Sequence, residues 1–214
     1  MGDVRAVPTA AGASGARLPD AARLRRALRR QYARLALFPE RPFHLHTGGL
    51  LAALLGYPGA DLEQVPEAGL AAFSGAAYPF ALGGISDGDR VLDVGCGSGL
   101  DALLAARVVG PGGSVAGIDL AAEMVGVAGD AARRSGRRNA TFREGLAEEL
   151  PFEDGAFDVV LSNNVLNHLV PDKPRALREM QRVLRPLGRL LLGDVVLERP
   201  VPDSGRAELD LWTT

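Results

Sequence analysis

Residues 87–120, DGDRVLDVGCGSGLDALLAARVVGPGGSVAGIDL, decide the fold of this 214-residue chain. The stretch begins with a short apolar run, passes through a glycine-rich turn into a helix-forming segment, and returns through PGG to a second apolar run. A strand, a crossover helix and a parallel strand within about 30 residues make a βαβ unit. The pattern therefore predicts an α/β fold with a parallel sheet and right-handed crossovers.

The alternation of strands and helices continues towards the C-terminus. Apolar runs predict further strands at residues 141–143, 157–162 and 189–196. Amphipathic segments predict helices at residues 121–134 and 173–184.

The region before the βαβ unit has a different composition. Residues 1–18 are rich in Ala, Gly, Pro and Ser and predict a disordered tail. Residues 19–85 begin with a helical pattern at 19–38 and continue as short apolar stretches between turns, which predicts a small helical N-terminal cap. We assign residues 86–214 to the ligand-binding core.

The glycine turn at 91–99, VLDVGCGSG, indicates which ligand the core holds. Gly95, Gly97 and Gly99 let the backbone turn sharply beneath a ligand. A dinucleotide fold has the spacing G-x-G-x-x-G and binds pyrophosphate at the helix N-terminus, but residue 100 is leucine. Asp93 would repel a pyrophosphate and attract a cofactor with an ammonium and a sulfonium. The charge favours S-adenosylmethionine (SAM) over NAD.

Asp119 supports the same interpretation from the end of the next strand. An acidic side chain at this place accepts hydrogen bonds from both hydroxyls of a ribose, so we expect adenosine beside it. An NAD-dependent reductase is also disfavoured because the sole lysine, Lys173, stands in PDKP and leaves no Tyr-x-x-x-Lys motif.

Both stretches resemble class I SAM-dependent methyltransferases. The resemblance runs from about residue 56 to residue 212 and includes FREGLAEELPFEDGAFDVVLSNN at 142–164 and RVLRPLGRLLLGD at 182–194. It implies a Rossmann-like parallel sheet, SAM as cofactor and methyl transfer as activity. Two positions differ: Leu146 stands where an aspartate commonly holds the adenine amine, and Leu187 replaces a turn glycine.

The resemblance also implies which residues contact the cofactor, because the family binds it along the turns that follow the strands. The implied cofactor-binding residues are Asp93, Gly95, Cys96, Gly97, Gly99, Asp101, Asp119, Leu120, Met124, Gly145, Leu146, Ala147 and Asn163.

Within the family, the chain most resembles arsenite methyltransferases. The resemblance rests on GLD at 99–101, DLAAEMV at 119–125 and SNNVLNHLVPDKPRALREMQRVL at 162–184. Arsenite chemistry there depends on several thiolates, because As(III) prefers sulfur. The family's cysteine positions hold Ala76 and Asn164, and the single cysteine, Cys96, lies in the glycine turn. We expect this scaffold to lack the three-thiol route.

Methyl transfer from a sulfonium is a direct displacement, so the protein mainly aligns the reactants and needs a base only when the nucleophile is protonated. The catalytic candidates are His168, Asn164 and Tyr78. We expect a small-molecule acceptor whose reacting atom is O, N, C, S or a metalloid. Two alternatives stay open: a catalytically incompetent fragment that binds SAM or S-adenosylhomocysteine, and an arsenite methyltransferase that works without the usual thiolates.

Composition limits the partners and the setting. The formal net charge of −2 gives no basic field for nucleic acid or anionic membranes. One cysteine permits no intramolecular disulfide and no Cys/His cluster for a metal, which favours a reducing, cytoplasmic setting. Relatives add two strands after the fifth, so we expect an incomplete sheet whose exposed edge, RLLLGDVVLE, pairs in a homo-oligomer or marks a truncated product.

Overall fold

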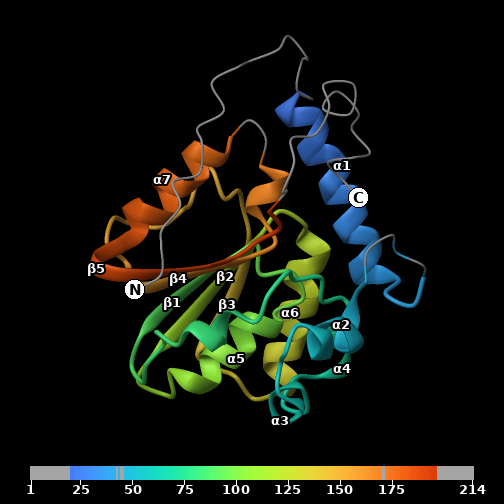
Figure 1. Cartoon of the computed structure of the whole chain (residues 1–214), viewed down its shortest axis with the longest axis horizontal. Coiled ribbons are helices and arrows are strands. Elements are labelled where there is room, and N and C mark those ends of the chain that lie inside the picture. The colour runs from blue at the N-terminus through green and yellow to red at the C-terminus, as the bar shows by residue number, and fades with distance from the viewer. Residues whose placement is uncertain (1–19, 42, 44–45, 170–171, 197–214) are drawn as a thin grey trace, which may run out of the picture.

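The structure is a computed structural model that describes residues 20–41, 43, 46–169 and 172–196 (Figure 1). The tail predicted at residues 1–18 lies outside these residues. Within the described residues, no helix combines the length and apolar character that crossing a bilayer requires.

A five-stranded parallel sheet forms the centre of the fold, and its strand order is β3-β2-β1-β4-β5. The strands are β1 (Arg90–Val94), β2 (Ser114–Asp119), β3 (Ala140–Glu144), β4 (Phe157–Asn163) and β5 (Leu184–Gly193). The predicted α/β fold with a Rossmann-like parallel sheet is confirmed. The order reverses between β1 and β4, where open α/β sheets place their ligand crevice.

Helices cover both faces of the sheet (Figure 1). They are α5 (Leu100–Val108), α6 (Ala122–Arg134) and α7 (Lys173–Val183). On β1, neighbouring side chains point to opposite faces: Val91 packs with Ala102 of α5, whereas Leu92 packs with Met180 of α7. Because both faces are covered, the central strands are almost continuously apolar.

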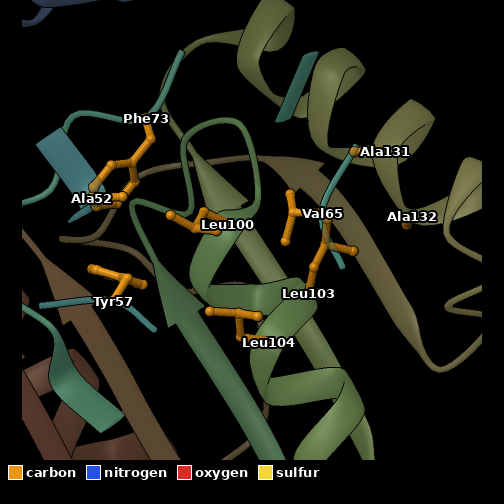
Figure 2. Close-up of a cluster of buried hydrophobic side chains, with 9 residues drawn as sticks. All are labelled: Ala52, Tyr57, Val65, Phe73, Leu100, Leu103, Leu104, Ala131 and Ala132. Carbon is orange, nitrogen blue, oxygen red and sulfur yellow. The ribbon is translucent and has the colours of Figure 1, made fainter. Parts of the chain in front are cut away.

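The described residues before β1 form four short or medium helices and a 3₁₀ turn. They are α1 (Ala21–Leu37), α2 (Gly48–Leu54), α3 (Gly59–Leu62), α4 (Glu67–Ala71) and η1 (Pro79–Leu82). Figure 2 shows Tyr57 and Phe73 from this segment beside Leu100 of α5, in one cluster of buried apolar side chains. The cluster attaches the segment to α5 and α6.

Helix α1 lies beside α6 (Figure 1) and contacts the loops that follow three strands. Leu24, Leu28 and Leu35 form its buried side. Its polar side reaches the loops: Arg25 pairs with Glu148 at 3.1 Å and with Asp172 at 2.8 Å. These contacts hold α1 across the carboxyl edge of the sheet.

Strand β5 begins earlier than expected and is interrupted. Its pairing with β4 shifts register between Phe157 and Val159, so that a short turn forms around Leu187. Leu187 has φ of 63° and is 95% exposed. This is the left-handed conformation that glycine adopts without strain, which explains why leucine is unusual at this turn.

We predict that Leu187→Gly stabilises the protein. The substitution removes a left-handed leucine that makes little contact, and the free energy of unfolding should rise by about 1 kcal/mol. Urea unfolding followed by circular dichroism measures this change. Leu190→Gly, in the regular part of β5, is the matched control and should lower the free energy of unfolding. A Leu187→Gly protein no more stable than wild type would contradict the assignment of strain.

Candidate functional site

A cavity opens at the carboxyl edge of the sheet, beside the point where the strand order reverses. It encloses about 1060 Å³, including space open to solvent, and is lined by residues that follow β1, β2, β3 and β4 and by residues of α1. Its place at the switch point of an open α/β sheet is where such folds bind their ligands.

The glycine turn forms the floor of the cavity. Gly95, Gly97 and Gly99 all have positive φ, at 75°, 51° and 92°. A Cβ on Gly97 would meet no atom within 4 Å, so the space above it belongs to the cavity. A Cβ on Gly95 would collide with Val165, and one on Gly99 would lie 2.9 Å from Cβ of Ala128.

Two buried carboxylates stand beside this turn. Asp93 is 2% exposed, and its Oδ2 has no hydrogen-bond partner among the described residues. Burial raises the pKa of Asp93 well above its ordinary value, and the negative charges of Asp101 and Asp119 raise it further. Burial also raises the pKa of Asp101, to about 6. The ionised forms of these carboxyl groups are costly in the empty site, and a bound cation would stabilise them.

Asp101 is held by two neighbours that oppose the effect of burial. It accepts hydrogen bonds from the hydroxyl of Tyr57 at 2.6 Å and from Nδ2 of Asn163 at 2.9 Å. Asn163 also accepts a hydrogen bond at its Oδ1 from the backbone N–H of Ala76, at 2.8 Å. The network joins the glycine turn, β4 and the segment before β1.

Asp119 is fixed by backbone groups rather than by a cation. Its Oδ2 accepts the N–H of Gly97 at 2.9 Å, and its Oδ1 accepts the N–H of Ala121 at 2.8 Å. Each carboxylate oxygen can accept a further hydrogen bond, so Asp119 can receive two hydroxyls.

Most residues expected from the sequence meet at this cavity. Those that line it are Asp93, Gly95, Cys96, Gly97, Asp101, Asp119, Leu120, Gly145, Leu146, Ala147, Asn163, Asn164 and His168.

Three expected residues do not line the cavity. Gly99 serves packing instead, because it brings the start of α5 close to Ala128 of α6. Met124 is fully buried in a cluster with Leu35. Tyr78 does not line the cavity either: its ring packs at a tilt against that of Tyr57, and its hydroxyl donates to Asp61 at 3.3 Å. Tyr57 is the tyrosine that bonds a residue of the site, through Asp101.

The potential sulfur and amide ligands do not form a metalloid site. Cys96 is buried, and burial raises the pKa of its thiol well above the ordinary value, so the thiol stays protonated. Asn164 donates through Nδ2 to the carbonyl oxygen of Ser74 at 2.8 Å, and Ala76 offers only its backbone. Soft metals require thiolate ligands, which these three residues do not provide.

Sequence reasoning missed the residues that α1 contributes. Leu24, Arg25, Leu28 and Tyr32 all line the cavity. The only signal was the amphipathic period of the helix, which indicates a buried face without saying what that face covers.

Comparison with known proteins agrees with the fold and the glycine turn. The methyltransferase domain family matches residues 85–213, which is more than half of the chain. The chain belongs to the methyltransferase domain family.

Relatives of this methyltransferase-family chain include arsenite methyltransferases, as the sequence motifs predicted. One from Halobacterium salinarum is 39% identical over 159 residues, which cover 74% of this chain and 40% of the relative. One from Aquipseudomonas alcaligenes is 44% identical over 133 residues, which cover 59% of this chain and 38% of the relative. The chain therefore spans about two fifths of the length of these curated relatives.

A solved structure supports the same relationship. The crystal structure of an arsenic(III) S-adenosylmethionine methyltransferase from Chlamydomonas reinhardtii matches with a TM-score of 0.59 and 38% identity. The match covers 78% of this chain and 55% of that one.

The acidic cluster predicts how the stability of this methyltransferase-family protein depends on pH. The folded-state pKa of Asp101, about 6, exceeds its ordinary value of 3.8, so its contribution is greatest below about pH 4 and is lost as pH rises through 6. Without ligand, Asp101 alone should lower the free energy of unfolding by about 1 to 2 kcal/mol between pH 5 and pH 7.5, and Asp93, whose pKa is also raised, adds to this fall.

Urea titrations at several pH values measure this slope. Asp101→Asn should flatten it because residue 101 no longer ionises. Asp130→Asn is the control and should keep the wild-type slope, since Asp130 is exposed and pairs with Arg133. Equal slopes in the wild type and Asp101→Asn would show that Asp101 does not titrate as its burial requires.

Proposed function

We propose that the chain binds SAM in this cavity and catalyses transfer of its methyl group to a small-molecule acceptor. The observation that carries the proposal is the convergence of Asp93, Asp101 and Asp119 on one partly apolar cavity. Among the described residues, no ion pair involves any of these carboxylates. Buried charges require a partner, which a cationic ligand supplies.

The residues present fit the parts of SAM, the cofactor of this family. The unpaired Oδ2 of Asp93 suits an ammonium group. Asp119, held by two backbone N–H groups, suits the ribose hydroxyls. The open space above Gly97 lets the ligand lie against the backbone between these two acids.

The adenine end of the site is apolar. Ile118, Leu120, Leu146 and Ala147 line that part of the cavity. Leu146 offers no hydrogen bond to an adenine amine, so we expect adenine to be held mainly by apolar contact here.

The chemistry needs little from the protein beyond alignment. Bound SAM supplies a methyl group on a positively charged sulfur. Tyr57 and Asn163 keep Asp101 in place, and the buried side of α1 excludes water from the cavity. Holding two reactants in line converts a bimolecular displacement into an effectively unimolecular one, which is a major source of rate enhancement.

Two alternative functions remain, and they predict different products. An arsenite acceptor is favoured by the arsenite methyltransferases among the relatives, but Ala76, Asn164 and protonated Cys96 do not give the thiolates that arsenic prefers. A fragment that binds SAM without turnover would share the cofactor site and form no methylated product.

Asp119→Ala tests the cofactor site. Losing the charge-assisted hydrogen bonds to a ribose should weaken SAM binding by several-fold to a hundred-fold, about 1 to 3 kcal/mol, in calorimetric titration. Asp130→Asn should leave the affinity for SAM unchanged. NADH should give no heat of binding. Tight NADH binding, or wild-type affinity for SAM in Asp119→Ala, would argue against the proposal.

Gly97→Ala separates binding from folding. A methyl group at residue 97 enters open space in the protein but occupies the place of the ligand, so SAM affinity should fall at least tenfold. Gly88→Ala is the matched control, because Gly88 also has positive φ and no atom within 4 Å but lies outside the cavity. Both variants carry similar backbone strain, about 1 kcal/mol, and only Gly97→Ala should lose SAM.

A further inference from the structure

Tyr32 and His168 form a pair in the wall of the cavity. The hydroxyl of Tyr32 lies 3.0 Å from Nε2 of His168, and the two rings meet edge to face with centroids 5.9 Å apart. Tyr32 comes from α1 and His168 from the turn η2 (Leu166–His168), so the fold joins segments far apart in the sequence. Both residues line the same cavity as the acidic cluster.

Tyr32 and His168 lie in the walls that α1 and the loop after β4 form, and we place the methyl acceptor against these walls. In the proposed function, Asp93 and Asp119 hold the charged and ribose groups of SAM. The remaining wall consists of Asn164, Val165, His168 and Leu169, which follow β4, and of side chains from α1. Val165, Leu169 and Leu28 add apolar surface beside the pair, and Asn164, Arg25 and Asp172 are the polar side chains nearby on the same two walls.

The groups around Tyr32 and His168 bear on which of the two donates the hydrogen bond between them. Burial raises the pKa of Tyr32 above its ordinary value of 10, and the charges of Asp119 and Asp194 raise it further, whereas a hydrogen bond with Ser74 lowers it. Asp172, at the start of α7, also lines the cavity and is paired with Arg25. Tyr32 therefore stays protonated at neutral pH. When its hydroxyl donates to Nε2 of His168, the imidazole is neutral and carries its own proton on Nδ1.

We propose that Tyr32 and His168 act together as the proton acceptor for a phenolic hydroxyl on an apolar substrate, and that phenols are the acceptor class of this site. The proposal rests on the proposed function.

The proton moves along one path in this step. As the acceptor oxygen bonds to the methyl carbon, its proton passes to the oxygen of Tyr32 and the Tyr32 proton passes to Nε2 of His168. The bond between the methyl carbon and sulfur breaks, its electron pair stays on sulfur, and S-adenosylhomocysteine leaves. The imidazolium then releases one proton to solvent, so the charge of the sulfonium ends as a free proton.

Acidity selects phenols among oxygen nucleophiles. A phenol has a pKa near 10, about 3 to 4 units above that of imidazole, so a histidine-based acceptor can assist its ionisation. An aliphatic alcohol is a much weaker acid, with a pKa close to that of water, roughly 15.7. A thiol has a pKa of about 8.5, so it ionises readily and gains little from a base. The apolar wall disfavours the charged ammonium form of an amine.

The experiment compares two phenols of similar size in the full chain. 4-Ethylphenol reaches the enzyme protonated, whereas 4-nitrophenol is largely ionised above neutral pH and needs no base. Tyr32→Phe and His168→Gln should each lower the rate of 4-ethylphenol methylation at least a hundred-fold, the usual range for a lost general base. Their rates with 4-nitrophenol should fall less than tenfold. Asp130→Asn, an exposed position of α6 outside the cavity, should behave as wild type.

A binding measurement accompanies the rates. With S-adenosylhomocysteine present, no methyl transfer occurs, and the absorbance of bound 4-nitrophenol reports how much of it is ionised at each pH. The bound phenol should ionise at lower pH in the wild type than in Tyr32→Phe or His168→Gln. A purely structural role for the pair would change both phenols alike and would not move this titration selectively.

The outcomes distinguish the inference from the proposed function. Failure of the wild type to bind SAM overturns both. SAM binding without methylation of 4-ethylphenol overturns the phenol assignment, and methylation of 4-ethylbenzenethiol or arsenite instead leaves the proposed function standing. Equal losses with the two phenols, or wild-type rates in both variants, overturn the role of the pair as proton acceptor.

Discussion

The structure depends on holding three acids together at the carboxyl edge of one parallel sheet. Asp93, Asp101 and Asp119 repel one another, and burial works against the ionised forms of the first two most strongly. Backbone N–H groups, a tyrosine hydroxyl and an asparagine amide offset part of this cost without adding a positive charge. No positively charged side chain pairs with the three acids among the described residues, so a cationic ligand can supply that charge. The same arrangement therefore lowers the stability of the empty protein and favours binding of a cationic cofactor.

Local patterns in the sequence predicted the sheet and much of the site, because their causes are local. The apolar runs define strands that are covered on both faces, and the end of each parallel strand meets the same edge. Asp93 and Asp119 were therefore identifiable from their positions at strand ends. The length of β5 was not predictable in the same way. The strand begins at Leu184, and its register shifts around Leu187, a leucine with positive φ.

Residues that reach the site from distant segments were harder to predict. Tyr57 and Tyr78 belong to the same segment before β1, and their rings pack against each other at a tilt. Only three-dimensional packing selects Tyr57 as the partner of Asp101. Arg25 and Tyr32 belong to a helix whose apolar period shows that one face is buried. That period does not predict that Arg25 contacts Glu148 or that Tyr32 contacts His168.

Helix α1 has a consequence for the order in which the protein folds. Its contacts with His168 and Asp172 join residues separated by 136 and 147 positions, so they close very long loops. Contacts of this kind form after the local βαβ units have assembled. During synthesis α1 leaves the ribosome before the chain beyond β4, so its contacts with His168 and Asp172 form only after that later segment has emerged. The packing of α1 on α6 does not require that segment, so the wall of the cavity at His168 is completed later than the attachment of the helix.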